Sequence, residues 1–175
     1  QPIKEKFDII MANPPFGIDG LKYDDFTSSI KFEYTPIKTD NAVSLFIQAI
    51  IYMLKIKGRC AIVLPNGKDI FSKTNKTFIQ IRKYLLKTCD LQEIIHFPSG
   101  IFTNTGVKTC IFYFIKKKEG NNIMTRIIKG NKITYDMCNE HTTKCVKFYQ
   151  YNEKDNCNKL IIEVDIDNIA DNFYS

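Results

Sequence analysis

The sequence predicts an α/β protein built on half of a doubly wound sheet, followed by a β-rich extension. Short apolar runs that suit buried strands recur before residue 118, and several of them end at a proline. Amphipathic segments with helical spacing lie between these runs. The resulting order of strand, helix, strand, helix, strand and strand is typical of an open sheet with helical crossovers.

The first predicted strand ends in a stiff loop. Residues Ile9 to Ala12 are apolar, as in a buried strand, and Asn13, Pro14, Pro15 and Phe16 follow directly. Proline cannot donate a backbone hydrogen bond to a neighbouring strand or continue a helix, and Pro14 also biases Asn13 towards extended geometry. The strand is therefore predicted to stop here, with an amide, two backbone carbonyls and an aromatic ring held in fixed relation.

This loop carries the groups needed to hold a planar amine such as that of adenine. The amide oxygen of Asn13 and the carbonyl of Pro14 can each accept one amine hydrogen, which localises the nitrogen lone pair. Phe16 can stack on a base rotated out of a duplex, and such stacking is worth about 1–3 kcal/mol. The alternative is a loop that only terminates the strand. The apolar run before it and the aromatic residue after it favour the functional interpretation.

Two amphipathic helices are predicted next. Asn41 to Lys55 carries apolar residues at positions i, i+3, i+4 and i+7, and Asn41 or Asp40 can cap its start. Phe78 to Leu86 forms the second helix, and its cap candidates are Ser72, Thr74 and Asn75. The long segment from Gly17 to Lys38 lacks clear periodicity, so we expect a loop that is functional or mobile.

Three further strands complete this part of the chain. Cys60 to Leu64 follows Gly58 and is closed by Pro65, as expected for a strand buried on both faces. Leu91 to Phe97 is also closed by a proline, and Lys108 to Ile115 follows a turn-like segment.

After Lys118 the pattern changes to short strands. β-rich runs cover 123–128, 132–137, 144–151 and 160–164, with Lys129-Gly130-Asn131 as a hairpin turn. We therefore divide the chain into an α/β unit over residues 1–118 and a β-rich extension over residues 119–175.

Composition and charge restrict the function classes. The chain has 175 residues, 44% of them hydrophobic, and a net charge of +6, which is outside the range of disordered chains. It has no apolar stretch long enough to span a membrane and no secretory leader, so we expect a cytoplasmic protein. The excess of 25 basic over 19 acidic residues suits a polyanionic partner. Lys68 and Lys73 are the predicted DNA contacts because they follow a strand's carboxyl end; the other basic residues are interpreted as a solvated surface.

The cysteines are interpreted as reduced thiols. Cys60 and Cys110 fall within predicted strands and Cys89 at a helix end. A looser group could be drawn as a zinc site, formed by Cys138, His141, Cys145 and Cys157. Because it lacks paired Cys-x2-Cys knuckles, no metal site is predicted. His96, just before a Phe-Pro pair, is expected to be structural and not a general base.

The segment from Lys6 to Lys118 resembles S-adenosylmethionine-dependent amino-methyltransferases, and most closely the adenine-N6 DNA methyltransferase subunit of type I restriction-modification systems. The resemblance rests on segments that occur in the order found in that family: Phe7 to Gly17, Leu45-Phe46, Gly58 to Gly67, Ile81 to Leu86, Ile94 to Phe102 and Thr105 to Ile111. It implies a Rossmann-like class I methyltransferase sheet, whose last two strands are antiparallel. Residues 1–118 would then be a partial catalytic domain.

The resemblance also implies an activity and its partners. The chain would contribute to site-specific N6 methylation of adenine in double-stranded DNA, with S-adenosylmethionine as cofactor and a DNA-specificity subunit as a possible partner. Asn13, Pro14, Pro15 and Phe16 would be catalytic, and Asn13 would also contact the cofactor. The family's glycine-rich cofactor turn should lie upstream of this loop, so we expect the N-terminal half to be missing and the fragment alone to be inactive.

Two alternatives remain open. Asn-Pro-Pro-aromatic loops also serve methyltransferases that act on guanine N2 in RNA or on glutamine side chains in proteins. The chain could otherwise be a remnant without catalysis that binds nucleic acid through its basic residues.

Overall fold

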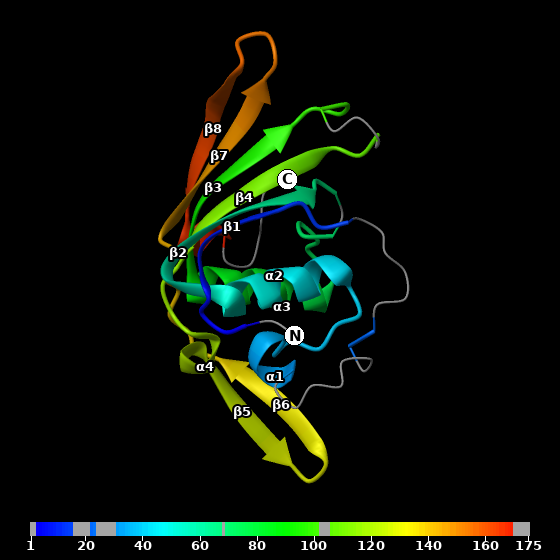
Figure 1. Cartoon of the computed structure of the whole chain (residues 1–175), viewed down its shortest axis with the longest axis vertical. Coiled ribbons are helices and arrows are strands. Elements are labelled where there is room, and N and C mark those ends of the chain that lie inside the picture. Colours follow the sequence, from blue (N-terminus) through cyan, green and yellow to red (C-terminus); the bar gives the residue numbers. More distant parts are fainter. Residues whose placement is uncertain (1–2, 16–21, 24–30, 68, 102–105, 170–175) are drawn as a thin grey trace.

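The alternating apolar and amphipathic segments form strands and crossover helices, as predicted. The computed structural model describes residues 3–15, 22–23, 31–67, 69–101 and 106–169. Six strands form one sheet in the order β1-β2-β4-β3-β7-β8 (Figure 1). Their bounds are β1 (Phe7–Ala12), β2 (Leu54–Pro65), β3 (Cys89–Phe97), β4 (Thr109–Lys116), β7 (Cys145–Asn152) and β8 (Cys157–Asp165).

The strand directions bring four carboxyl ends to one edge of the sheet. β1 is parallel to β2 and β3 is parallel to β7, whereas β4 is antiparallel to both β2 and β3. β1, β2, β3 and β7 therefore all point the same way. The predicted antiparallel pair of the α/β unit is confirmed as β3 with β4.

The helices are α1 (Lys31–Tyr34), α2 (Ala42–Met53), α3 (Lys76–Thr88), α4 (Gly120–Ile123) and α5 (Ile166–Ile169). Asn41 caps α2, since its Oδ1 accepts a hydrogen bond from the Ser44 amide at 2.9 Å. The alternative cap, Asp40, instead accepts from the Tyr23 amide at 2.8 Å. Asn75 caps α3 by accepting from the Thr77 amide at 3.0 Å. None of the helices in the described ranges combines the length and hydropathy needed to cross a bilayer.

The joint between α2 and β2 differs from the prediction. The predicted helix ran to Lys55, but α2 ends at Met53 and β2 begins at the next residue, six residues before the predicted strand. Lys57 has a positive φ of 70°, and a Cβ on Gly58 would lie 2.7 Å from the Lys55 carbonyl oxygen. Gly58 is therefore a point of close backbone approach inside the strand and not the end of a loop.

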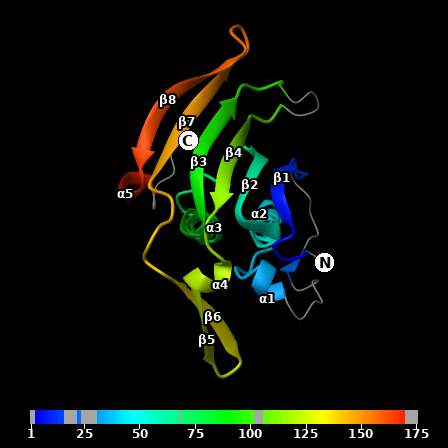
Figure 2. The ribbon, with the colours of Figure 1, turned by 60° about the vertical axis from the view of Figure 1, so that its left-hand side comes forward.

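The core lies between the sheet and one layer of helices. α2 and α3 lie on the same face of the sheet (Figure 2), and they bury a continuous apolar cluster against it. Its central members are Ile47, Ile51, Ile62, Leu64, Ile81, Leu85, Phe112 and Phe114.

The opposite face of the sheet is half-exposed, which corrects the prediction that the second strand is buried on both faces. Cys60, Ile62 and Leu64 face the helices and are buried, whereas Ala61 and Val63 alternate with them and are only half-buried. The physical reason is that both of the longer helices in the described part of the chain cover the other face.

β1 also differs from the expected buried strand. Ile9 is 58% exposed and Met11 is 83% exposed, while Ile10 and Ala12 pack against the core. Within the described residues, β1 pairs only with β2, so it is an edge strand. The apolar side chains of β1 therefore lie on both faces of the strand, and within the described residues only the face with Ile10 and Ala12 is covered.

The strands after Lys118 take two forms. β5 (Met124–Lys129) and β6 (Lys132–Met137) form a separate hairpin that projects from the molecule (Figure 1), with Gly130 at a φ of 59° in its turn. β7 and β8 instead extend the main sheet beside β3. The β-rich character predicted for this segment is confirmed, and the division at Lys118 stays a prediction.

Candidate functional site

The carboxyl edge of the sheet collects polar residues from several strands. The register places Leu64, Cys110, His96 and Gln150 side by side across β2, β4, β3 and β7. The residues that follow these positions in β2, β3 and β7, and those that precede Cys110 in β4, therefore lie at one edge of the sheet. In open α/β sheets this is the edge at which ligands bind.

The predicted catalytic loop leaves β1 at this edge. Ala12 pairs with Ile62, so Asn13 lies level with Val63 on the neighbouring strand. Asn13 and Pro15 are exposed, and Pro14 is buried. Buried Pro14 anchors the loop, while the Asn13 amide is available to a ligand. Phe16 lies outside the described residues.

Asn66 lies at the same edge, one residue beyond β2. Its amide Nδ2 donates a hydrogen bond to His96 Nδ1 at 2.9 Å, and its backbone amide donates to the Lys108 carbonyl at 2.7 Å. The His96 ring stacks on Phe148 with a centroid separation of 6.1 Å. Burial lowers the pKa of His96, which favours the neutral imidazole that can accept from Asn66. This geometry supports a positioning role for His96.

The basic residues at this edge are only partly those expected. Lys73 is exposed between β2 and α3, and Lys68 lies outside the described residues. Lys108 is exposed immediately before β4 and reaches the same edge because β4 runs antiparallel to its neighbours. Sequence reasoning missed Asn66 and Lys108; their positions directly after and before predicted strands were the available signal.

The cysteines divide into buried and exposed groups. Cys60, Cys89 and Cys110 are buried free thiols, as predicted. Burial raises the pKa of Cys89 to about 12 and also raises the pKa values of Cys60 and Cys110. These groups are therefore poor nucleophiles and poor metal ligands at neutral pH.

The loose Cys/His group is not gathered into a site. Cys145 pairs with Asp165 and Cys157 pairs with Asn152, so the two thiols lie at opposite ends of the β7–β8 ladder. Cys145 donates to a Glu163 carboxylate oxygen at 3.2 Å. Across the described ranges, no three His, Cys, Asp or Glu side chains are grouped to hold a metal ion.

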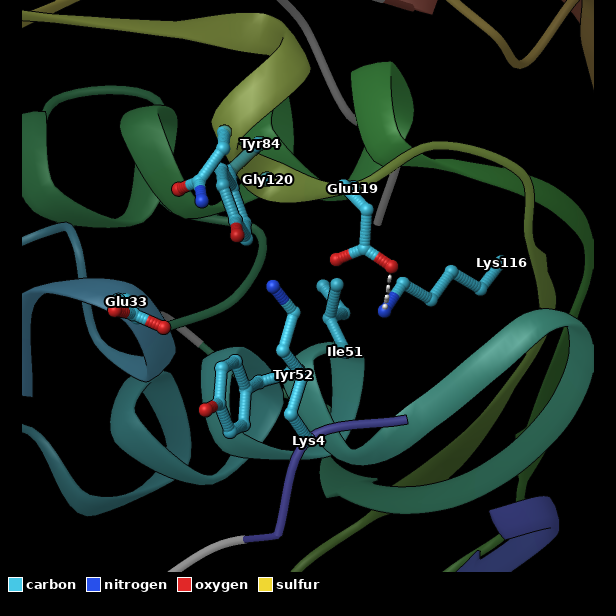
Figure 3. A pocket seen from close by; sticks show the side chains of 9 residues that line it. Lys4, Glu33, Ile51, Tyr52, Tyr84, Lys116, Glu119 and Gly120 are labelled. Atoms are coloured by element: carbon cyan, nitrogen blue, oxygen red, sulfur yellow. Dashed lines mark ion pairs between the residues drawn. The ribbon is translucent and has the colours of Figure 1, made fainter. Parts of the chain in front are cut away.

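A different polar cluster occupies the opposite end of the sheet (Figure 3). The fully buried Lys116 ammonium donates to the Leu54 carbonyl at 2.8 Å and lies 3.2 Å from a Glu119 carboxylate oxygen. Tyr84 and Gly120 line the same cavity, whose volume is about 10 Å³. This is room for about one water molecule. The cluster therefore stabilises the fold and has no room for a ligand larger than water.

The carboxyl edge supplies only part of a site for S-adenosylmethionine. Asn13 is exposed beside the open edge of β1, where a cofactor could meet it. The sequence contains no Gly-x-Gly-x-x-Gly turn. The residues present therefore include one candidate contact for such a cofactor, Asn13, but no glycine-rich cofactor turn.

Comparisons with known proteins agree with this arrangement. A profile of the family described as N-6 DNA Methylase matches residues 1–175. The chain is similar to the type I restriction enzyme EcoEI methylase subunit of Escherichia coli, with 40% identity over 113 residues that cover 64% of this chain and 21% of the relative. It is also similar to the HindI methylase subunit of Haemophilus influenzae, with 30% identity over 119 residues, 68% of this chain and 26% of that relative.

Solved structures show the same fold. The crystal structure of the type I restriction enzyme EcoKI M protein is 27% identical, with a TM-score of 0.57 over 84% of this chain and 26% of that chain. A Listeria monocytogenes structure described as a class I S-adenosylmethionine-dependent methyltransferase is 14% identical, with a TM-score of 0.51 over 83% of this chain and 37% of that one. The predicted Rossmann-like class I methyltransferase sheet is thus confirmed, and S-adenosylmethionine is the cofactor of this class.

The matches cover only part of each relative. The chain spans 21% and 26% of the two curated relatives, so it matches one segment of each of those methylase subunits. The family profile nevertheless covers its whole length. The chain belongs to the N-6 DNA methylase family.

Proposed function

We propose that this chain is the acceptor-holding segment of a type I restriction-modification methylase that forms N6-methyladenine in double-stranded DNA. The observation that carries the proposal is the loop at the carboxyl end of β1, where Asn13 is exposed and Pro14 is buried. Family membership and the methylase subunits among its relatives support DNA as the substrate. The segment before residue 118 would be the partial catalytic domain, and residues 119–175 its β-rich extension.

The loop acts on the amine of the target base. Asn13 Oδ1 and the Pro14 carbonyl each accept one N6 hydrogen, which draws the nitrogen towards tetrahedral geometry and localises its lone pair. Preorganised acceptors of this kind need no reorganisation during the reaction. Phe16 follows them in the sequence and stacks on the flipped adenine, which offsets part of the cost of unstacking.

The methyl group comes from bound S-adenosylmethionine, which supplies an electrophilic carbon. Asn13 lies where the base and the cofactor would meet, so it contacts both. The remaining cofactor contacts belong to the part of the methylase subunit that this chain does not match. The open edge of β1 and its exposed Ile9 and Met11 provide the surface on which that part completes the sheet.

Basic side chains and a partner subunit bind the DNA. Lys73, which follows β2 at the carboxyl edge, and Lys68, which precedes it in the sequence, neutralise backbone phosphates, which gives affinity without sequence preference. A DNA-specificity subunit would then supply the choice of target sequence. This function places the protein in the cytoplasm.

The test is transfer of a labelled methyl group from S-adenosylmethionine to unmethylated double-stranded DNA and, in parallel, to RNA and to protein, followed by nucleoside and amino-acid analysis and by a DNA-binding assay. The full-length subunit, with its specificity subunit, is compared with the chain alone. We expect labelled N6-methyladenine from the full-length protein only. Label in guanine of RNA or in protein glutamine would overturn the assigned acceptor, and DNA binding without transfer to any acceptor would favour a non-catalytic module.

A further inference from the structure

A cavity of about 510 Å³ opens at the carboxyl edge, away from the Asn13 loop. It is lined by Asn66, which follows β2, by the ends of β3 and β7, by β8 and by Lys108, which precedes β4. Three interstrand spacings separate β1 from β3 in the sheet order, so the β3 wall of the cavity lies about 14 Å from β1. Both sites therefore face a ligand that approaches this edge.

A β-bulge builds one wall of the cavity. Phe148 pairs with Ile162 and the next residue, Tyr149, pairs with Leu160, so Ile161 is left without a partner in the ladder. Ile161 and Ile162 consequently both line the cavity although they are consecutive in a strand, and they are 59% and 49% exposed. Bulges re-aim side chains in this way and are over-represented next to active sites.

The other walls carry groups that recognise nucleobases. Asn66 and Gln150 carry amides and Lys108 carries a positive charge, and no lining residue is acidic. The aromatic lining residues are His96, Phe97 and Phe148, and the Phe97 ring packs against Tyr151 with centroids 5.3 Å apart. Amide side chains hydrogen-bond to base edges, aromatic rings stack on base faces and lysines neutralise phosphates. The hydrogen bond from Asn66 to His96 fixes one of the two amides.

We propose that this cavity holds an unstacked nucleobase of the bound DNA, distinct from the adenine that is methylated. The inference rests on the proposed function and adds a second nucleotide site to it. The apolar wall of Ile161 and Ile162 and the Phe97 ring contact the faces of the base, while the amides contact its edge. The separation of about 14 Å is less than half of a ~34 Å helical turn, so one short segment of DNA can reach both sites.

The experiment uses the full-length methylase subunit with its specificity subunit. DNA containing the recognition sequence carries 5-iodouracil at successive positions around the target adenine, and mass spectrometry identifies the photo-crosslinked residues. DNA affinity and the KM for S-adenosylmethionine are measured for Gln150→Ala and Phe97→Leu, which removes the aromatic face but keeps an apolar side chain. Gln80→Ala, an exposed glutamine of α3 outside the cavity, is the matched control.

We expect one position other than the target to crosslink to Phe97 and to lose that crosslink in Phe97→Leu. Phe97→Leu should weaken DNA binding at least about fivefold, the lower end of a base-stacking contribution. Gln150→Ala should weaken DNA binding by more than Gln80→Ala does, with the KM for S-adenosylmethionine within twofold of wild type. Unchanged DNA affinity in both cavity variants, or an effect on the cofactor KM alone, would overturn the inference. The wild-type yield of N6-methyladenine reports separately on the proposed function.

Discussion

Lys108 precedes strand β4 and Lys116 ends it, and the two side chains have opposite environments. Lys108 is exposed at the carboxyl edge, beside the exposed Gln150 and the half-buried Asn66. Lys116 is fully buried at the other end, where the Leu54 carbonyl and Glu119 engage its ammonium group. The polar groups at this buried end contact one another and stabilise the fold, whereas those at the carboxyl edge keep hydrogen-bonding capacity for a ligand. Variants at the two ends should therefore separate stability from activity.

The largest effect on activity is expected from Asn13→Ala at the open edge. It removes one of two acceptors for the target amine, and loss of a single preorganised polar group costs about 10²- to 10³-fold in turnover. Methyl transfer to DNA by the full-length subunit is the measurement. The urea midpoint and cofactor affinity should stay near wild type because Asn13 is exposed. Full turnover in this variant would refute the assigned role.

Lys116→Met should produce the largest effect on stability. It removes the ammonium that Leu54 and Glu119 engage, and breaking a buried pair in this way costs about 3–5 kcal/mol. Lys118→Met is the control, because Lys118 lies 3.7 Å from the 73%-exposed side chain of Glu140. Such exposed pairs contribute about 0–1 kcal/mol. Urea unfolding of both variants gives the comparison, and equal midpoints would show that the contacts of buried Lys116 do not stabilise the fold.

Two glycines, one at each end of the sheet, should differ less in their effect on stability. A Cβ on Gly120 would collide with the Tyr84 hydroxyl, whereas a Cβ on Gly67 at the open edge would meet no described atom within 4 Å. Gly120→Ala should destabilise the fold by about 1–3 kcal/mol, as overpacking does. Gly67→Ala should change stability by less than about 0.5 kcal/mol. Thermal unfolding distinguishes them, and similar melting temperatures would contradict the tight packing inferred around Tyr84.

The smallest expected effect concerns pH. Burial, followed by the hydrogen bond that protonated Glu119 donates to the Glu5 carboxylate, raises the pKa of Glu119, and accepting this hydrogen bond lowers the pKa of Glu5. The stabilisation from protonated Glu119 is present below its ordinary pKa and is lost as pH rises through the raised value. That from Glu5 is present above its ordinary pKa and is lost as pH falls through the lowered value, but Glu5 is exposed and contributes little.

Glu119→Gln isolates this contribution. Relative to the variant, wild type should lose stability as the pH rises from about 4.5 towards neutrality. Urea midpoints of both proteins across this range provide the measurement. Parallel pH profiles would show that Glu119 does not titrate differently in the folded state.

Local sequence signals predicted much of the fold. Asn41 and Asn75 each precede an amphipathic segment and both cap a helix, because a cap depends on residues within one turn. The hairpin strand at 132–137 was also predicted with its observed bounds. The start of β2 was not predicted, since Leu54 continues the apolar spacing of α2 and the change to strand depends on backbone contacts made by Gly58.

The sequence predicted the Asn13 loop but not the other residues of the site. The prolines after Asn13 revealed the loop because they act locally. Asn66, Lys108 and Gln150 come together only through the register of four strands, which no spacing in the sequence shows. The exposure of β1 was missed for a related reason: an apolar run indicates that a surface is buried, but not by which segment.

The direct passage of α2 into β2 and of α3 into β3 sets where this chain can tolerate insertions. No residue separates Met53 from Leu54 or Thr88 from Cys89 at these junctions. One extra residue within either strand would turn its following side chains to the opposite face and displace the polar groups at its far end. An extra residue in the solvent-exposed hairpin turns near Gly130 or at 153–156 would not change the facing of side chains in β2 or β3. Length differences among related chains should therefore accumulate at these turns and be rare at the helix-to-strand junctions.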